Sequence, residues 1–401
     1  MKILMLSWEF PPNLNGGLGR HVADLSPSLA ERGVMVHVVT PYPEPTPEPE
    51  QIGQNLFIHR VDITSINLEA DIHTQARQAN SLLYKAAEAL WGTVGGFDLI
   101  HVHDWLVSFA AIQLKQAYKC PIVATIHATE AGRWRSNVLT NSLSQAIHQA
   151  EERLTAEAWR VIACSRHMVA ELHRIFHVSS EKVNMIPNGV HLADPACIEA
   201  GGLRDIKEQF VPHSAPLIFC VGRLVFEKGQ HILIGAMPEV LSVFPDARLV
   251  LAGKGPLLGY LQTIVQDMGL QDHVHFAGFV TDQERDQFFA NADCAVFPSL
   301  YEPFGIVALE AMACNCPVVV SNLDGLAEVV EHEQTGLLIY PDNSDSAAWA
   351  ILQILKKPFV AKQYAANACQ MIAERYSWQR IATQTIDLYQ RVIDERAGID
   401  W

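Results

Sequence analysis

Two glutamates eight residues apart, Glu302 and Glu310, carry side chains suited to holding a hydroxyl-rich ligand. Carboxylate oxygens accept hydrogen bonds from hydroxyl groups. The apolar run 294–297 predicts a strand that ends just before Glu302, and open α/β sheets bind ligands at that edge. Glu310 lies about one and a half turns into the helix expected over 306–312. Gly305 leaves the free backbone N–H groups of that helix accessible to an anion or a hydroxyl oxygen.

Arg223 and Lys228 form a second pair, two cations in the loop that follows the expected strand 216–221. Arginine donates two parallel hydrogen bonds to phosphate oxygens and lysine adds a point charge, so the two side chains could clamp a diphosphate. Two solubilising surface charges are the alternative interpretation. Gly253 opens a similar turn after the next strand, 248–252, and could face the same ligand.

A glycine-rich loop connects the first expected strand, 2–7, to a helix expected from about residue 18 to residue 32. Gly16 and Gly17 let a ligand approach the backbone amides at this junction. The glycine spacing differs from G-x-G-x-x-G, so the loop is not the dinucleotide-binding fingerprint. Turns use glycine often, and the loop alone indicates only where a ligand could bind.

Histidines end or follow two of the expected strands. His101 and His103 lie on the same side of the strand 98–103 and could chelate a metal ion. No third ligand is near them in the sequence, so we expect satisfied polar residues there and predict no metal site. His127 lies just past the next apolar strand, on the same sheet edge as Gly17, which makes it a candidate for ligand binding. Arg133 and Arg135 follow as surface charges or as contacts to an anionic or hydroxyl-rich ligand.

The composition limits the class of function. The chain has 401 residues, enough for two or three domains, with 49% hydrophobic and 18% charged residues. A net charge of −15 argues against nucleic acid or an anionic membrane as the main partner. No apolar run has transmembrane length, and Glu9 ends the apolar start too early for a signal peptide. Eight scattered cysteines predict reduced, buried thiols and a cytoplasmic enzyme.

Strands of four to six residues alternate with helices through both halves of the chain. This rhythm predicts an α/β fold with two doubly wound, Rossmann-like parallel sheets that face one another across a cleft. We expect the first domain over 1–190, completed by a last helix at about 378–401. The second domain is expected over 191–377. The oligomeric state is open.

The segment 302–319 carries a more specific signature. Glu-Pro-Phe-Gly, then Leu-Glu-Ala-Met-Ala, then Pro-Val-Val resembles the paired-glutamate motif of retaining glycosyltransferases with two Rossmann-like domains, the GT-B type, family 4-like. That family includes sucrose-phosphate synthases, bacterial mannosyl- and glucosyltransferases and glycogen-synthase-like enzymes. The His-Asp-Trp string at 103–105, the loop 222–229 and the boundary near Asn188-Gly189 resemble the same family.

The resemblance implies roles for individual residues. Catalytic roles are implied for Glu302, His127, Arg223 and Lys228. Donor binding is implied for Gly17, Arg223, Lys228, Gly253, Val280, Glu302, Phe304, Gly305 and Glu310. Acceptor binding is implied for Asn15, Gly16, Arg133 and Arg135. The backbone around Val280 would meet the base, and Glu310 would hold the ribose hydroxyls.

The resemblance also implies a reaction. A nucleotide diphosphate-sugar would donate its sugar with retention of anomeric configuration, and the leaving phosphate would take the acceptor's proton. No general base, cofactor or metal is required, because two cations can neutralise the leaving group. The chain also lacks the Asp-x-Asp motif of the other transferase class.

The resemblance leaves donor and acceptor open. The start Trp-Glu-Phe-Pro-Pro with Gly-Gly-Leu-Gly favours glycogen-synthase-like glucosyl transfer. Asn15 stands where bacterial and plant starch-type glycogen synthases have lysine, which favours the broader family. Fructose 6-phosphate, as in sucrose-phosphate synthases, and a lipid-linked sugar remain possible acceptors. UDP-, ADP- and GDP-sugars all remain possible donors.

Two further functions are compatible with the same fold. One is a sugar-nucleotide epimerase or a phosphorylase, although a phosphorylase needs a pyridoxal-binding lysine in a longer chain. The other is an inactive carbohydrate- or nucleotide-binding protein. The presence together of Arg223, Lys228, Glu302, Glu310 and His127 argues against loss of activity.

Overall fold

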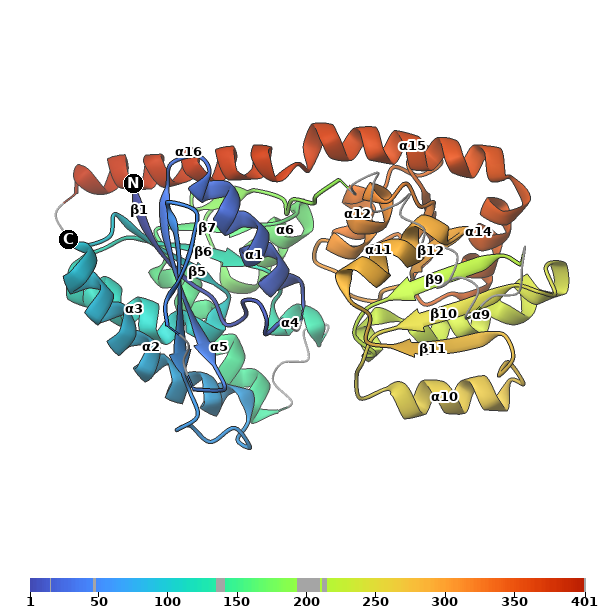
Figure 1. Ribbon diagram of the computed structural model, residues 1–401, viewed down its shortest axis with the longest axis horizontal. Coiled ribbons are helices and arrows are strands. Elements are labelled where there is room, and N and C mark those ends of the chain that lie inside the picture. The colour runs from blue at the N-terminus through green and yellow to red at the C-terminus, as the bar shows by residue number, and fades with distance from the viewer. Residues whose placement is uncertain (15, 46–47, 135–140, 193–209, 211–214, 400–401) are drawn as a thin grey trace. The chain divides into compact units, whose positions relative to one another are not determined.

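The computed structural model divides into two compact units (Figure 1). Unit 1 comprises Met1–Gly189 and Trp378–Trp401, and unit 2 comprises Val190–Ser377. Asn15 and Arg135, both expected at the acceptor, lie outside the described residues. The structure describes residues 1–14, 16–45, 48–134, 141–192, 210 and 215–399.

Unit 1 is built on an eight-stranded sheet in the order β3-β4-β2-β1-β5-β6-β7-β8, which is parallel except for the pairing of β3 with β4. The strands are β1 Lys2–Leu6, β2 Met35–Tyr42, β3 Glu50–Ile52, β4 Leu56–Asp62, β5 Leu99–His103, β6 Ile122–Ile126, β7 Arg160–Ala163 and β8 Val183–Met185. The helices are α1 Gly17–Ala30, α2 Ile72–Val94, η1 Trp105–Val107, α3 Ser108–Tyr118, α4 Glu130–Arg133, α5 Ser142–Glu157, α6 Arg166–Phe176 and α16 Trp378–Ala397.

Unit 2 is built on a six-stranded parallel sheet in the order β11-β10-β9-β12-β13-β14. The strands are β9 Leu217–Val221, β10 Arg248–Ala252, β11 Val274–Gly278, β12 Cys294–Phe297, β13 Val318–Ser321 and β14 Leu337–Ile339. The helices are η3 Phe226–Lys228, α9 Gln230–Val243, α10 Leu258–Asp267, α11 Asp282–Asn291, α12 Ile306–Ala313, α13 Leu326–Val329, α14 Ser344–Lys356 and α15 Pro358–Arg375. The predicted pair of doubly wound parallel sheets is therefore confirmed.

Local sequence signals fix several element ends. Asp71 begins α2 by accepting a hydrogen bond from the Thr74 backbone at 3.0 Å, and Ser165 does the same for Met168 at the start of α6. The spacing of Thr281 and Glu284 predicts a capping box, and the two residues form one at the start of α11.

Two boundaries differ from the sequence prediction, which places a helix over 151–159 and an extended, proline-rich loop over 41–49. The helix expected over 151–159 starts at Ser142, because Asn141 caps it through two backbone N–H groups. The segment expected to be helical from 344 to the end consists of three helices, of which Pro358 starts the second, and the last begins at Trp378 as predicted. The loop expected over 41–49 is shorter, because Pro41 is buried within β2.

The described helices include none whose length and hydrophobicity together would carry it across a bilayer. The seven cysteines in the described part of the chain are all free thiols, and six of them are buried.

Candidate active site

In unit 2 the predicted donor residues follow the carboxyl ends of neighbouring strands. Arg223 follows β9, Gly253 follows β10, Val280 follows β11 and Glu302 follows β12. These strands are adjacent in the order β11-β10-β9-β12 and run parallel. Their carboxyl ends therefore share one edge of the sheet, where doubly wound folds bind ligands.

Lys228 and Glu302 form an ion pair across two of these loops. The Lys228 ammonium lies 2.5 Å from Glu302 Oε2, and the two side chains are 23% and 12% exposed. The Leu300 N–H donates to the Glu227 carbonyl at 2.7 Å and ties the same loops together. Arg223 lies 3.7 Å from Glu227 and remains half-exposed. A lysine, a carboxylate and a solvent-facing guanidinium thus occur in one pair of loops.

Glu302 is also fixed through its backbone. Its N–H donates to Asp324 Oδ2 at 3.1 Å, and its carbonyl accepts from Gly325 N–H at 3.0 Å. Gly305, at the start of α12, has φ +99°, and a Cβ there would lie 2.6 Å from the Leu326 side chain. The left-handed φ favours glycine at this position, and the first N–H groups of a helix such as α12 have no partner within the helix.

Gly253 holds the loops after β9, β10 and β11 in backbone contact. Its φ is +133°, and a Cβ there would lie 2.0 Å from the Gly222 carbonyl oxygen. Its N–H donates to the Gly278 carbonyl at 2.6 Å. The close approach requires glycine at this position.

Arg285 is a site residue that sequence reasoning missed. Its guanidinium lies 3.0 Å from Glu310 Oε1, and it also pairs with Asp282 and Asp286 on its own helix, α11. The side chains of Arg285 and Glu310 are 14% and 12% exposed. The sequence signal for this residue was a single arginine among acidic residues at the start of α11. The signal did not show that Arg285 pairs with a residue of α12.

In unit 1 the predicted residues follow three adjacent strands, β1, β5 and β6. Gly16 and Gly17 lead into α1 after β1, and the Gly16 N–H donates to the Glu9 carboxylate at 3.1 Å. His103 ends β5 and His127 follows β6. The predicted edge therefore brings the glycine loop and His127 to the same side of this sheet.

His127 is held by Asp104. Its backbone N–H donates to Asp104 Oδ1 at 2.7 Å, and its Nε2 lies 3.2 Å from His103 Nδ1 in a hydrogen bond. Burial lowers the pKa of His127 well below its usual value, so the ring is neutral near pH 7. Burial also raises the pKa of Asp104 to about 7, and the bond from His127 partly opposes this. Asp104 belongs to the His-Asp-Trp string at 103–105, which indicated no role for this carboxylate.

Arg133 faces carboxylates of its own unit. Its guanidinium lies 3.6 Å from Glu130 Oε2, and its charge opposes the rise that burial causes in the pKa of Glu151. Glu130 and Glu151 are buried and joined through the Glu130 N–H. The expected acceptor contact of Arg133 remains a prediction, and this carboxylate group competes for its charge.

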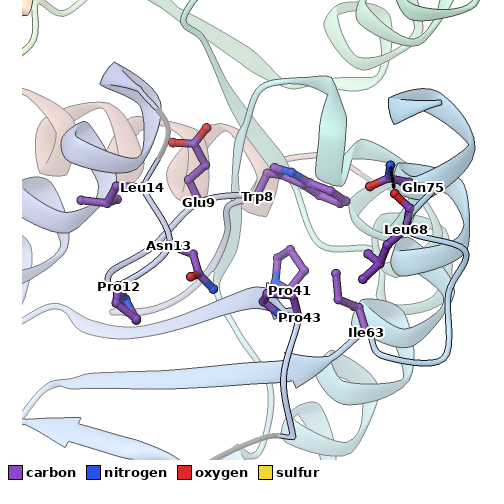
Figure 2. A pocket seen from close by; sticks show the side chains of 10 residues that line it. All are labelled: Trp8, Glu9, Pro12, Asn13, Leu14, Pro41, Pro43, Ile63, Leu68 and Gln75. Atoms are coloured by element: carbon purple, nitrogen blue, oxygen red, sulfur yellow. Dashed lines mark hydrogen bonds between the residues drawn. The ribbon is translucent and has the colours of Figure 1, made fainter. Parts of the chain in front are cut away.

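A pocket of about 370 Å³ opens beside the glycine loop of unit 1 (Figure 2). Trp8 and the apolar side chains of Pro41, Ile63 and Leu68 form one part of it. Polar groups from Glu9, Asn13 and Gln75 complete the lining, with Pro12, Leu14 and Pro43. An aromatic face with a few polar groups suits a sugar ring, which has apolar C–H faces and a rim of hydroxyls. Sequence reasoning did not identify this pocket.

Nearly the whole chain matches known glycosyltransferases. Residues 204–371 match the family model described as glycosyl transferases group 1, and residues 15–194 match that of Glycosyltransferase Family 4. An uncharacterized glycosyltransferase of Methanocaldococcus jannaschii is 36% identical over 97% of this chain and 98% of its own length. A glycogen synthase of Mycobacterium tuberculosis is 34% identical over 97% of this chain and 94% of its own length.

Solved structures show the same architecture. The sucrose-phosphate synthase from Thermosynechococcus elongatus superposes with a TM-score of 0.82 at 27% identity, covering 98% of this chain and 99% of that one. The catalytic domain of starch synthase IV from Arabidopsis thaliana gives 0.73 at 19% identity, covering 98% and 99% of the two chains. The chain therefore belongs to the group 1, family 4 glycosyltransferases and has the GT-B fold.

Proposed function

We propose that the protein is a retaining hexosyltransferase that moves a glucosyl unit from a nucleotide diphosphate-glucose to a glucan, as a glycogen synthase does. The observation that carries the proposal is the Lys228–Glu302 pair, near Gly305 at the start of α12 and the half-exposed Arg223. Cations for a diphosphate and a carboxylate for sugar hydroxyls lie in adjacent loops. The glycogen synthase at 34% identity supports this choice of substrate.

Arg223 and Lys228 would stabilise the departing nucleotide. As the bond from the sugar C1 to the phosphate oxygen breaks, negative charge develops on that oxygen, and nearby cations lower the energy of this state. Glu302 and the amides of Phe304 and Gly305 would hold the sugar hydroxyls, and Glu310 the ribose hydroxyls. The acceptor oxygen forms its bond to C1 on the same face, and its proton passes to the leaving phosphate. This scheme needs no general base and no metal.

His127 would contact the donor sugar as a neutral ring. A neutral imidazole can donate one hydrogen bond and accept another, whereas a charged one only donates. Asp104 fixes the backbone of His127 at 2.7 Å, and we assign Asp104 as a positioning residue. The pocket beside Trp8, lined by one indole and several polar groups, would receive the acceptor glucan, with Gly16 at its border.

Transfer to a sugar phosphate is the second candidate function. The observation that favours it is the TM-score of 0.82 with a sucrose-phosphate synthase. A small phosphorylated acceptor requires a free cation, and the pairing of Arg133 with Glu130 makes this candidate the weaker one.

A donor-by-acceptor activity matrix tests the proposal. UDP-glucose, ADP-glucose and GDP-mannose are each combined with glycogen, with fructose 6-phosphate and with no acceptor, and nucleotide release is measured. We expect glycogen-dependent release from a glucose donor, with an α-linked product by NMR. Release only with fructose 6-phosphate would instead establish the second candidate. No release with any pair, from protein that still binds UDP, would refute transferase activity on these substrates.

A further inference from the structure

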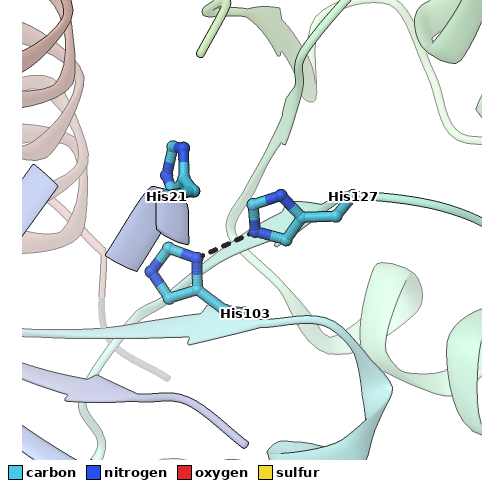
Figure 3. A group of neighbouring side chains, drawn as sticks. All are labelled: His21, His103 and His127. Carbon is cyan, nitrogen blue, oxygen red and sulfur yellow. Dashed lines mark hydrogen bonds between the residues drawn. The ribbon is translucent and has the colours of Figure 1, made fainter. Parts of the chain in front are cut away.

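Three histidines from separate parts of unit 1 meet at one point (Figure 3). His21 comes from the first turns of α1, His103 from the end of β5, and His127 from the residue after β6. One ring nitrogen from each lies within 4.8 Å of the others. His103 and His127 share a hydrogen bond of 3.2 Å, and the His21 ring stands edge-on to His127 with centroids 4.8 Å apart.

Several ring nitrogens of this group have no hydrogen-bond partner within the described part of the chain. Neither nitrogen of His21 has a hydrogen-bond partner there, nor does Nε2 of His103, and all three atoms are buried. The Asn188 side chain approaches His21 and opposes the fall in its pKa, but without a hydrogen bond of normal geometry. A buried nitrogen without a partner is costly, and a bound ion would remove that cost at one nitrogen of His21. In His103 the nitrogen that faces His127 is Nδ1, so the ion would bind that atom and not Nε2.

The protonation state of the rings suits a metal ion. Burial lowers the pKa of His21 to about 4 and those of His103 and His127 well below their usual value. Neutral imidazole is the form that binds metals. Three histidines with an open fourth position form a known ligand set for Zn²⁺ and its neighbours. At metal–nitrogen distances of about 2.1 Å the nitrogens would lie about 3.4 Å apart. His103 and His127 are already at 3.2 Å, so His21 must approach them by up to about 1.4 Å.

We propose that His21, His103 and His127 form a binding site for a divalent transition-metal ion such as Zn²⁺ or Co²⁺, and that its occupation inhibits the transferase. The ion would replace the hydrogen bond between His103 and His127 by two metal–nitrogen bonds. The ring that donates that bond would shift its proton to its other nitrogen. The inhibition, though not the binding, rests on the proposed function, because it follows from the loss of His127 as a sugar contact.

The chain supplies a matched control. His37 and His59 also share a hydrogen bond, of 3.0 Å, and stack with ring centroids 5.2 Å apart. This pair has no third ligand in the described metal-capable groups. Buried thiols are poor competitors near pH 7, because burial raises the pKa of Cys220 and Cys314 to about 12.

Cobalt binding tests the site without any need for activity. Metal-free wild type, His21→Leu and His59→Leu are each titrated with Co²⁺. Tetrahedral d–d absorption and bound cobalt after gel filtration are measured. We expect the wild type and His59→Leu to bind one equivalent with these bands, and His21→Leu to bind at least about tenfold more weakly without them. If His21→Leu does not fold, by circular dichroism, His21→Gln replaces it.

Sugar transfer is measured in the same samples, with and without Co²⁺. We expect Co²⁺ to inhibit the wild type and His59→Leu reversibly, with recovery on chelation, and His21→Leu to resist inhibition. Unchanged cobalt binding in His21→Leu, or loss of binding in His59→Leu alone, would overturn the site. Binding with undiminished transfer would overturn its inhibitory role. Cobalt bands in a protein that transfers no sugar would uphold the site and refute only the proposed function.

Discussion

The side chains proposed to hold the donor are already paired with cations. Glu302 is bound to Lys228 and Glu310 to Arg285, and all four side chains are mostly buried. Partly desolvated ion pairs restrict the orientation of both partners more than exposed pairs do. Each carboxylate is therefore positioned before a sugar nucleotide arrives, and the loss of its cation should change binding more than folding.

The variant Arg285→Ala tests whether the paired cation positions the Glu310 carboxylate. Without Arg285 the carboxylate loses its orientation, and we expect KM for the donor to rise about tenfold while kcat changes less than about threefold. Arg375→Ala is the control, because it breaks a pair with Glu331 that is shorter, at 2.7 Å, but whose side chains are 56% and 39% exposed. Steady-state kinetics with varied donor give both constants. An unchanged donor KM in Arg285→Ala would contradict the positioning role.

His21 predicts a pH dependence of stability. Its folded pKa, about 4, is depressed from the ordinary 6.5, so both states are neutral above pH 6.5. As the pH falls from 6.5 to 4, the unfolded chain takes a proton that the folded chain refuses, and the free energy of unfolding falls. Between pH 7 and pH 5 this group should cost about 2 kcal/mol.

Urea unfolding of wild type and His21→Leu at both pH values measures this contribution. We expect the variant to lose about 2 kcal/mol less than the wild type on acidification. Equal losses in the two proteins would show that His21 does not resist protonation in the folded state.

At the scale of elements, the loops after β9, β10 and β11 depend on one close backbone approach. Gly253 at φ +133° lies where a Cβ would meet the Gly222 carbonyl oxygen at 2.0 Å. No rotamer change relieves a contact with backbone, so the loops themselves must move. Both the stability of unit 2 and the placement of Arg223, which directly follows Gly222, depend on this contact.

Gly253→Ala should therefore lower the free energy of unfolding by about 2–4 kcal/mol. Gly259→Ala is the matched control, because nothing lies within 4 Å of its Cβ position inside α10. There alanine should stabilise by up to about 1 kcal/mol through helix propensity. Urea unfolding distinguishes them. Equal free energies of unfolding for Gly253→Ala and the wild type would show that the loop backbones can move apart without loss of stability.

The elements that carry the site could be predicted because each ends in a local signal. Apolar runs gave the strands, and Thr281 with Glu284 gave the start of α11. Arg285 with Glu310, and His21 with His127, could not be predicted, because each pair comes from different elements whose facing surfaces depend on packing. Hydrophobic periodicity indicates which face of a helix is buried, but it does not indicate which polar side chains of different elements contact one another.

At the scale of the whole molecule, the last helix of the chain, α16, packs into the core of the unit that begins with β1. The buried residues Trp378, Tyr389 and Val392 of α16 belong to the same core cluster as Ile3 and Met5 of β1. Gly189, the last residue of the first stretch of unit 1, has no room for a Cβ, because Trp378 would lie 2.5 Å away. Unit 1 therefore depends on the last helix for its core.

Trp378→Ala should destabilise unit 1 by about 3–5 kcal/mol, since it leaves a large cavity. Trp349→Ala is the control, because Trp349 is 43% exposed, and it should cost less than about 1 kcal/mol. Thermal or urea unfolding followed by circular dichroism compares the two. Similar losses in both variants would mean that α16 is not part of the cooperative core.

The central claim is that cations of unit 2 receive the departing nucleotide. The most direct test is the rate of sugar transfer by the double variant Arg223→Ala/Lys228→Ala at saturating acceptor. The exposed pair Lys356→Ala/Lys357→Ala serves as the charge-matched control. We predict a fall in kcat/KM of at least about a thousandfold for the first variant, in protein that stays folded, and less than about twofold for the control. Undiminished transfer by Arg223→Ala/Lys228→Ala would contradict the account.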